Sequence, residues 1–423
     1  MRTQVKNAFY AQSGGVTSVI NSSACGLIQT ARENSNEISK VFAGKNGIIG
    51  ALKEELIDTS LESDDTVAGL NSTPGGAFGS CRFKLGDPET NTELYQRLID
   101  VFRAHNINYF FYNGGGDSQD TTNKIARYSQ SVGFPIKCIG IPKTVDNDLP
   151  VTDCCPGFGS VAKYVATSIL EASLDVESMA ATSTKVFILE VMGRHAGWIA
   201  AAAGLARENT GQPPHIILFP EIPFEKDKFI SKVIETVKKH QFCSIVASEG
   251  IKYSNGKFLA EQGNHDAFGH AQLGGVAPTI AEIVKTNTGF KYHWAVSDYL
   301  QRSARHIASD TDVKQAYSVG KAALEFALKG KNAIMPIIKR ISNSPYRWEV
   351  SYTDLSNVAN IEKNLPQNYI DEEGYGITNN CREYMRPLIA GENYPSFSNG
   401  IPVYSKPMNQ LVKRILNDDF SIE

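Results

Sequence analysis

The fold is decided by a stretch early in the chain, residues 109–129, which reads YFFYNGGGDSQDTTNKIARYS. The four aromatic residues at 109–112 are typical of a buried strand, residues 114–116 are three consecutive glycines, and residues 121–129 have the periodicity of a helix. A strand that runs through a glycine-rich turn into a helix is the repeating unit of an α/β domain. Because each glycine loses much backbone entropy on folding, three in a row predict a ligand that must approach the backbone closely.

The same strand–turn–helix order recurs along the rest of the chain. Short apolar strands that alternate with helices of about 10–15 residues indicate mostly parallel sheets with helices on both faces. After about residue 343 the periodicity is weak, and we predict that this part of the chain covers a second domain irregularly. The other predicted strands are residues 7–12, 137–141, 184–191, 215–219 and 244–248, and the other predicted helices are residues 19–32, 197–207 and 229–240.

Length, composition and charge restrict the class of protein. A chain of 423 residues is long enough for two domains, and its net charge of −3 gives no general attraction to nucleic acid or anionic membranes. The seven cysteines form no CxxC pair, which argues against a disulfide framework and a structural zinc site. The longest apolar run, residues 198–206, is much shorter than the roughly 20 residues of a membrane span. The first residues show no targeting pattern, so we expect a cytoplasmic protein with neither nucleic acid nor membrane as a partner.

Two glycine-rich turns, Ser13–Gly15 and Gly114–Ser118, follow predicted strands and open predicted helices. Ligands of parallel sheets bind beyond the carboxyl ends of the strands, where helix N-termini present N–H groups to anions. Each sequence alone could be a plain tight turn, but two of them in one domain favour a phosphate site. Neither matches the P-loop or the dinucleotide-binding pattern, so those two classes of fold are not supported.

A third loop, residues 142–148, reads PKTVDND and combines a lysine with two aspartates. Lys143 would neutralise a transferring phosphate, while one of Asp146 and Asp148 would accept a hydroxyl proton and the other would orient metal-bound water. An Asx-rich turn explains the same residues without any chemistry. Next to two turns of the anion-binding type, the chemical interpretation is the stronger one, and the loop predicts phosphoryl transfer.

Arginines and an acid follow other predicted strands. Arg194 follows the strand at 184–191, and Arg302 lies in the motif YLQRS. An Arg guanidinium offers a planar fork for a phosphate, although an exposed Arg usually forms only a surface salt bridge. Glu249 ends the strand at 244–248 and could hold the hydroxyl groups of a sugar, although a solvated acid explains it equally well. Together these residues predict an α/β enzyme that transfers phosphoryl groups onto a small phosphorylated hydroxyl compound.

The order of the motifs resembles the phosphofructokinase family, and within it the pyrophosphate-dependent branch, from Ala11 to about Gly330. The motifs are, in chain order, SGG, GGAFGSCRF, GGGDS, PKTVDNDL, EVMGR, ASEG and YLQRS. The resemblance implies two Rossmann-like αβα domains with mostly parallel sheets, a chain that crosses between them more than once, and an active site in the cleft between the domains. It implies a pyrophosphate-binding domain of residues 1–157 and about 300–335, and a fructose-6-phosphate-binding domain of residues 158–299 and about 336–423.

The resemblance also implies a reaction and its partners. The expected reaction is reversible, magnesium-dependent phosphoryl transfer from pyrophosphate to the 1-hydroxyl of fructose 6-phosphate, giving fructose 1,6-bisphosphate and phosphate. The alternatives are an ATP-dependent 6-phosphofructokinase and a non-catalytic regulatory subunit, although a silent subunit would have lost motifs that this chain keeps. Lys185 matches a family Arg that reaches into a neighbouring subunit's sugar site, so a homodimer or homotetramer is expected.

Roles for single residues follow from the same resemblance. Asp146 is expected to be the general base and Thr144 to hold the transferred phosphoryl group, with Lys143, Asp117 and Arg194 assisting in catalysis. The expected donor-binding residues are Gly15, Arg82, Gly115, Gly116 and Lys143. The expected residues for the sugar phosphate are Thr144, Val145, Asp146, Lys185, Met192, Gly193, Arg194, Glu249, Tyr299, Leu300, Gln301 and Arg302, with Tyr299 and Arg302 on the 6-phosphate.

The glycine loop departs from the family pattern. The family usually has GGDGS or GGDDS, with the first Asp serving magnesium, and here that position is Gly116. The expected magnesium ligand is therefore Asp117, with Asp148 as the second candidate. Asp117 and Lys143 are typically Gly in ATP-using relatives. A carboxylate at position 117 would repel the α-phosphate of a nucleotide, which favours pyrophosphate as the donor.

A second departure concerns the segment Gly269–Gly275, GHAQLGG, which superficially resembles a motif of the ATP enzymes. Leu273 stands where those enzymes have an essential Arg. We therefore assign the 6-phosphate to YLQRS and not to the segment around His270, which makes residues 263–290 a predicted insertion.

Overall fold

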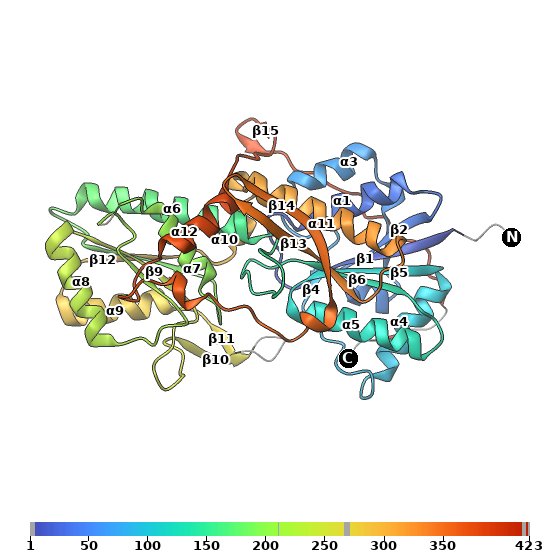
Figure 1. Ribbon diagram of the computed structural model, residues 1–423, viewed down its shortest axis with the longest axis horizontal. Helices are drawn as coiled ribbons and strands as arrows, with labels where there is room; N and C mark the ends of the chain where they lie inside the picture. The colour runs from blue at the N-terminus through green and yellow to red at the C-terminus, as the bar shows by residue number, and fades with distance from the viewer. Residues whose placement is uncertain (1–4, 210, 266–270, 417–419, 422–423) are drawn as a thin grey trace.

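Two αβα lobes lie side by side in the computed structural model, which describes residues 5–209, 211–265, 271–416 and 420–421 (Figure 1). The first lobe is built on an eight-stranded sheet and the second on a four-stranded sheet. The expected α/β class, with two mostly parallel sheets covered by helices, is confirmed. Two small hairpins complete the strands: β10 (Glu261–His265) with β11 (Ala271–Leu273), and β15 (Phe397–Ser398) with β16 (Ile401–Pro402).

The first sheet is parallel in its centre and antiparallel at its edges. Its edge strands β3 and β14 run antiparallel to their neighbours, and β4 (Ser80–Cys81) pairs with the carboxyl end of β1. In spatial order the remaining strands are β14 (Tyr346–Asp354), β13 (Ile334–Asn343), β6 (Lys137–Pro142), β5 (Ile107–Gly114), β1 (Lys6–Ser13), β2 (Ile38–Gly44) and β3 (Leu56–Asp58).

Strand β1 shows why the sheet is covered on both faces. Ala8 and Tyr10 belong to one apolar cluster, while Phe9 and Ala11 belong to another, and all four side chains are fully buried. Since successive residues of a strand point to opposite faces, both faces must be packed. Each large apolar side chain buried in this way contributes roughly 1.5–3 kcal/mol to folding. The first face is covered by α1 (Ile20–Glu33) and α11 (Asp310–Leu328), and the second by α4 (Thr92–Ala104) and α5 (Gly116–Ser131).

The second sheet is entirely parallel and follows the same rule. Along β7, Val186 and Ile188 enter one apolar cluster, whereas Leu189 and Val191 enter the cluster that continues into the first lobe. In spatial order the strands are β12 (Tyr292–Val296), β7 (Val186–Val191), β9 (Cys243–Ser248) and β8 (Ile216–Leu218). The helices of this lobe are α6 (Phe158–Met179), α7 (Trp198–Ala203), α8 (Lys226–His240) and α9 (Val276–Thr288).

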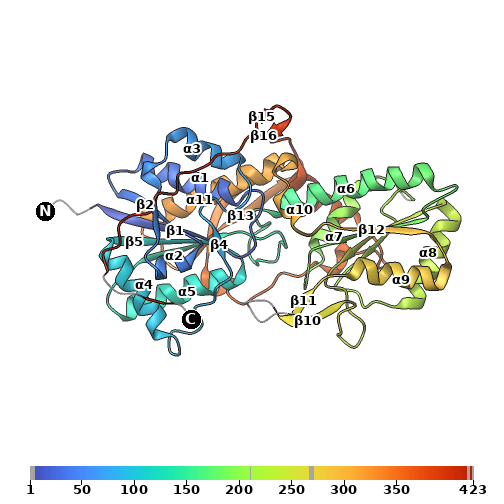
Figure 2. The same ribbon diagram turned by 180° about the vertical axis from the view of Figure 1, so that it is seen from behind.

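The chain crosses between the lobes several times, as the resemblance implied. It enters the second lobe through α6, returns through α10 (Asp298–Ser303) and α11, and then adds β13 and β14 to the first sheet. Residues of the tail cross again, because Ile217 N donates to Tyr375 O at 2.9 Å. The chain then comes back to the first lobe, where Val412 N donates to Leu56 O at 2.8 Å. Figure 2 shows β1 and β13, which lie far apart in the sequence, together in the first lobe.

The tail is more regular than predicted and belongs to both lobes. The prediction of an irregular cover over the second domain misses the strand β14. The second domain was also expected to include the chain from about residue 336 onward, whereas β13 and β14 belong to the sheet of the first lobe. These two strands form one antiparallel hairpin, with Ile338 opposite Val350. A helix, α12 (Asn379–Met385), follows further along the tail.

The predicted insertion at 263–290 contains α9, whose buried residues Val276, Ile280 and Val284 pack in the second lobe. His270 lies outside the described residues.

The helix predicted at 121–129 begins already at Gly116, so the glycine turn itself opens α5. Two further short helices are α2 (Ile48–Leu52) and α3 (Asp64–Gly69).

Over the described ranges, the structure has no helix with the length and apolar character that crossing a membrane requires. All seven cysteines are free, and six of them are buried.

Candidate active site

The glycine-rich turns and the PKTVDND loop lie side by side because they follow neighbouring parallel strands. β1 ends at Ser13, β5 at Gly114 and β6 at Pro142. Ser118 Oγ donates to Ser13 Oγ at 2.8 Å, and the backbone N of Lys143 donates to Gly114 O at 3.2 Å. The structure therefore brings the three predicted loops together at one edge of the first sheet.

Two guanidinium groups converge on Gly15. The preceding Gly14 has a φ of +70°, which favours glycine, and turns the chain after β1. A Cβ on Gly15 would lie 2.5 Å from a terminal nitrogen of Arg302 and 3.5 Å from a terminal nitrogen of Arg82. Arg82 reaches this position because β4 pairs with the end of β1. The missing side chain at position 15 is therefore what admits both cations to the turn.

Lys143 is a third cation at the same turn. It is only 4% exposed, and its Nζ donates to Gly15 O at 2.7 Å. Burial, followed by the charges of Arg302 and Arg82, lowers the pKa of Lys143 to about 8. Cations that repel one another across a buried turn are stabilised by a bound anion, so this arrangement suits a small ligand of high negative charge.

Asp117 lies in the first turn of α5, which begins within the second glycine-rich turn. Its carboxylate forms an ion pair with Lys84 at 3.0 Å, and both side chains are partly exposed. Lys84, which no sequence motif marked, neutralises part of the charge that was expected to repel a nucleotide. At Gly116 a Cβ would meet no atom within 4 Å, so this position borders open space.

Asp146 is half-buried at the centre of the third loop. Burial, followed by the charges of Asp148 and Glu249, raises the pKa of Asp146 to about 7. Thr144 Oγ1 lies 3.4 Å from Asp146 Oδ2 and accepts a hydrogen bond from Asp146 N at 3.1 Å. A carboxylate that titrates near neutrality is suited to accept a proton from a hydroxyl group. The adjacent Val145 is buried in the apolar cluster that joins the lobes.

Residues at the ends of β7 and β9 form the facing wall. Gly193 has a φ of +134°, and a Cβ there would lie 2.8 Å from Ala196 O and 3.0 Å from Ser248 Oγ. Gly193 N donates to Glu249 Oε1 at 3.3 Å, and burial raises the pKa of Glu249. Arg194 Nε is buried without a hydrogen-bond partner among the described residues, so a donor is available at this wall.

The motif YLQRS forms α10 and connects the two walls. Gln301 is buried, and its Oε1 accepts a hydrogen bond from Met192 N at 3.3 Å, so it fixes the end of β7. The guanidinium of Arg302 lies 3.8 Å from the centre of the Tyr299 ring. Tyr299 and Leu300 are 61% and 64% exposed. Arg302, within the predicted 6-phosphate motif, thus contacts both the Tyr299 ring and the donor turn at Gly15.

Lys185 does not join the site of its own chain. It precedes β7, whereas Met192 follows the same strand at its other end. Six residues of strand, at about 3.3 Å each, separate these positions by roughly 20 Å. The other predicted residues lie around the three loops or the facing wall.

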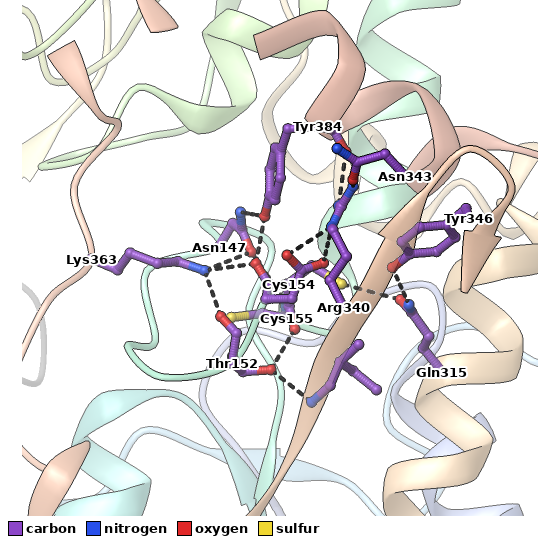
Figure 3. Close-up of polar contacts among 12 residues, drawn as sticks. Asn147, Thr152, Cys154, Cys155, Gln315, Arg340, Asn343, Tyr346, Lys363 and Tyr384 are labelled. Carbon is purple, nitrogen blue, oxygen red and sulfur yellow. Dashed lines mark hydrogen bonds and ion pairs between the residues drawn. The ribbon is translucent and has the colours of Figure 1, made fainter. Parts of the chain in front are cut away.

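The structure adds residues that the sequence analysis missed. Asn147 lies fully buried between the two aspartates, and it contacts Tyr384 and Lys363 from the tail (Figure 3). Because Tyr384 and Lys363 are more than 200 positions away in the chain and follow no motif, no local pattern could have identified them. The D-N-D pattern around Asn147 gave the only local signal, that of an Asx turn.

Two carboxylates of the site are candidates for holding a metal ion. The described residues contain no group of three or more His, Cys, Asp or Glu side chains arranged to hold one. Mg²⁺ bound with a phosphate substrate needs only one or two carboxylates, since phosphate oxygens and water complete its shell. Asp148 Oδ1 is buried without a hydrogen-bond partner among the described residues, and Asp117 stands at the donor turn. These two carboxylates fit a Mg²⁺ that enters with its substrate.

Comparisons with known proteins agree with this geometry. The profile of the phosphofructokinase family matches residues 7–327. The pyrophosphate–fructose 6-phosphate 1-phosphotransferase of Halomonas elongata is 62% identical over 410 residues, covering 97% of this chain and 98% of that protein. The protein of the same name from Methylococcus capsulatus is 59% identical over 417 residues, covering 99% of each. A crystal structure of pyrophosphate-dependent phosphofructokinase from Marinobacter aquaeolei has a TM-score of 0.91 and 61% identity, covering 99% of this chain and 100% of that one.

Proposed function

The chain belongs to the phosphofructokinase family, and from this we propose that it transfers a phosphoryl group reversibly from pyrophosphate to the 1-hydroxyl of fructose 6-phosphate. The products are fructose 1,6-bisphosphate and phosphate. The relatives that are about 60% identical over nearly their whole length carry the name of this activity. The ATP-dependent alternative is less supported by these names.

The choice of pyrophosphate as the donor rests mainly on Lys143 and Arg82 at Gly15; Arg302 faces the same turn but is assigned below to the 6-phosphate of the sugar. Lys143, Arg82 and Arg302 all face this turn, and their mutual repulsion would be relieved by a bound anion. Pyrophosphate has no adenosine and must obtain its binding energy from its phosphates, so a compact set of cations is the recognition that it needs. Lys143 would also stabilise the negative charge on the phosphate that leaves.

Asp146 is proposed as the general base. Its carboxylate would accept the proton of the sugar 1-hydroxyl while that oxygen attacks the transferring phosphorus, and the bond to the leaving phosphate breaks. The raised pKa of Asp146 supports this role, because a stronger base accepts the hydroxyl proton more readily. Thr144, whose hydroxyl lies next to this carboxylate, would hold the transferred phosphoryl group, and Gly115 and Gly116 would give the donor access to the backbone.

The sugar phosphate is proposed to bind across the cleft. Arg194, with its unpaired Nε, would contact the transferring group and the sugar, and Glu249 would accept hydrogen bonds from sugar hydroxyls. Met192 and Gly193 would line the sugar at the end of β7. Arg302 with Tyr299 would hold the 6-phosphate, while Gln301 acts through the backbone of Met192. The first lobe would thus bind the donor and the second lobe the acceptor.

Magnesium is proposed as the cofactor, held by Asp117 and the donor phosphates, with Asp148 as the second candidate ligand. When bound, it would neutralise phosphate charge during transfer. The ion pair between Asp117 and Lys84 places a cation next to this carboxylate, where it would add positive charge near the donor phosphates.

An oligomer is proposed from the position of Lys185. This cation lies at the amino end of β7, far from the cleft of its own chain, and would complete the sugar site of a neighbouring copy. The free cysteines agree with a reducing compartment, which supports the cytoplasm as the location.

The test is direct observation of the products. Purified protein with fructose 6-phosphate, pyrophosphate and Mg²⁺ should give the ³¹P signals of fructose 1,6-bisphosphate and phosphate. Adding those two products to fresh enzyme should regenerate pyrophosphate. Absence of both reactions would contradict the proposed function.

A further inference from the structure

The loop that carries Asp146 and Asp148 is held from behind by the C-terminal part of the chain (Figure 3). Asn147 lies between the two aspartates, is fully buried, and has a φ of +54°. A residue in this left-handed conformation reverses the chain locally, so it sets the directions of the side chains on both sides of it. The bonds that hold Asn147 therefore bear on where both carboxylates point.

The side chain of Asn147 is bonded at both of its ends. Its Oδ1 accepts a hydrogen bond from Cys155 N at 2.9 Å, which closes the loop on itself. Its Nδ2 donates to the hydroxyl of Tyr384 at 3.0 Å, and that hydroxyl donates in turn to Asp153 O at 2.5 Å. One phenol from α12 thus joins the middle of the loop to its far end.

Lys363 supports the same loop from another side. Its Nζ donates to Thr152 O and Asp153 O, both at 3.1 Å, and lies 3.5 Å from Asn147 Oδ1. Its backbone N donates to Asp148 O at 2.7 Å. If the ammonium group were removed, the carbonyl oxygens of Thr152 and Asp153 would lose a hydrogen-bond donor in a mostly buried place. This loss would disfavour the present conformation of the loop.

Neighbouring groups fix the two tail residues in turn. Trp198 Nε1 donates to Lys363 O at 2.9 Å, and the ammonium lies 5.3 Å from the centre of the Trp198 ring. Arg340, on β13, donates to both carboxylate oxygens of Asp153 at 3.0 Å and to Tyr384 O at 2.9 Å. In Figure 3, Lys363 and Arg340 approach the loop from opposite sides. The support is therefore rigid and comes from both lobes.

We propose that Lys363 and Tyr384 are positioning residues for phosphoryl transfer, which hold the Asn147 backbone so that the Asp146 carboxylate faces the sugar 1-hydroxyl. The proposal rests on the proposed function. Both residues lie beyond the family match at 7–327, and both act through Asn147 and the loop carbonyls. Since a misplacement of about 1 Å can cost roughly 10²-fold in rate, their loss should lower kcat by about 10–100-fold. The KM values for both substrates should change by less than about threefold, because the donor and sugar contacts are made by other residues.

The test compares variants that remove only the interacting atoms. Lys363→Met keeps the length of the side chain without the charge, Lys363→Arg keeps the charge, and Tyr384→Phe removes only the hydroxyl. Two matched controls are Lys331→Met, whose ammonium lies 4.6 Å from the Tyr352 ring centre, and Tyr317→Phe, whose hydroxyl donates to Gln29 Oε1 at 2.8 Å. Each variant is assayed for kcat, for both KM values and for thermal unfolding.

We expect kcat to fall in Lys363→Met and Tyr384→Phe, to recover in part in Lys363→Arg, and to stay unchanged in both controls. If Lys363→Met does not fold, the Tyr384→Phe variant alone tests the proposal, because it removes a single oxygen atom and keeps the packing of the ring. Unchanged kcat in Tyr384→Phe and in a folded Lys363→Met would overturn the proposal. A rise of KM with kcat preserved, or equal losses in the controls, would also overturn it. Wild-type enzyme without any activity would instead contradict the proposed function.

Discussion

Lys143 Nζ donates a hydrogen bond to the carbonyl oxygen of Gly15 at 2.7 Å and so joins the loop of the general base to the glycine turn of the donor. The two loops belong to β6 and β1, which are separated in the sheet by β5. A single side chain therefore couples the site that binds the donor to the loop that activates the acceptor. In this position, burial and the charges of Arg302 and Arg82 lower the pKa of Lys143.

Asp146→Asn should lower kcat by about 10²–10⁴-fold, because an amide cannot accept the proton of the 1-hydroxyl. The KM values should stay within a few-fold, since Asn keeps the size of the side chain. Steady-state kinetics with pyrophosphate and fructose 6-phosphate measure both quantities. Asp310→Asn, which removes an ion pair with Lys314 away from the cleft, is the control. Near-native turnover in Asp146→Asn would show that another group is the base.

The pH dependence of kcat/KM should be a narrow bell. Asp146 acts as a base only when deprotonated, so the rate should rise as pH increases through the pKa of about 7. Lys143 binds the donor only when protonated, so the rate should fall as pH increases through the pKa of about 8. Lys143→Arg keeps its charge at high pH and should move the descending limb upward. A descending limb that is identical in the two enzymes would contradict this assignment.

Arg302→Ala tests the residue that joins the two walls. We expect the KM for fructose 6-phosphate to rise by at least about 10-fold, because a charge-assisted pair with the 6-phosphate is worth about 1.5–3 kcal/mol. Arg302 also faces Gly15, so a smaller rise in the KM for pyrophosphate should accompany this change. Arg347→Ala, on β14, serves as the control. If the KM for pyrophosphate rises more, Arg302 belongs mainly to the donor site.

Asp117→Gly should weaken discrimination against ATP. Two like charges about 4 Å apart repel by about 4 kcal/mol at an effective dielectric constant near 20. The ion pair with Lys84 reduces this repulsion in the free enzyme. We expect detectable ATP turnover in Asp117→Gly, and a further loss of pyrophosphate use when Lys143→Gly is added. Lys84→Met in the wild-type background should tighten the discrimination. If Asp117→Gly turns over ATP no faster than the wild type, the carboxylate is not the barrier.

Much of the fold could be predicted from the sequence because parallel strands are buried on both faces. The residues YFFY at 109–112 and VFILEV at 186–191 have no polar side that could face water, except for Glu190. Glu190 is kept inside by hydrogen bonds from the backbone N–H groups of Gly275 and Ala277. The tail was harder to predict, because β13 and β14 alternate buried with exposed residues toward their hairpin end and so lack the continuous apolar run of the central strands.

The loops of the candidate site could be predicted because each one ends a strand. Which residues support those loops could not be predicted in the same way. Lys363 and Tyr384 contact the loop through folding of a distant tail, and their own neighbours in sequence carry no motif. Lys84 was missed for a related reason, because an ion pair with Asp117 depends on the path of the chain after β4.

The central claim is that pyrophosphate is the phosphoryl donor, and the ratio of kcat/KM for pyrophosphate to kcat/KM for ATP tests it most directly. Both values should be measured on the wild-type protein at one concentration of fructose 6-phosphate and Mg²⁺. The account predicts a ratio of at least about 10², since charge repulsion of a few kcal/mol corresponds to that factor or more. A ratio near one, or one that favours ATP, would contradict it.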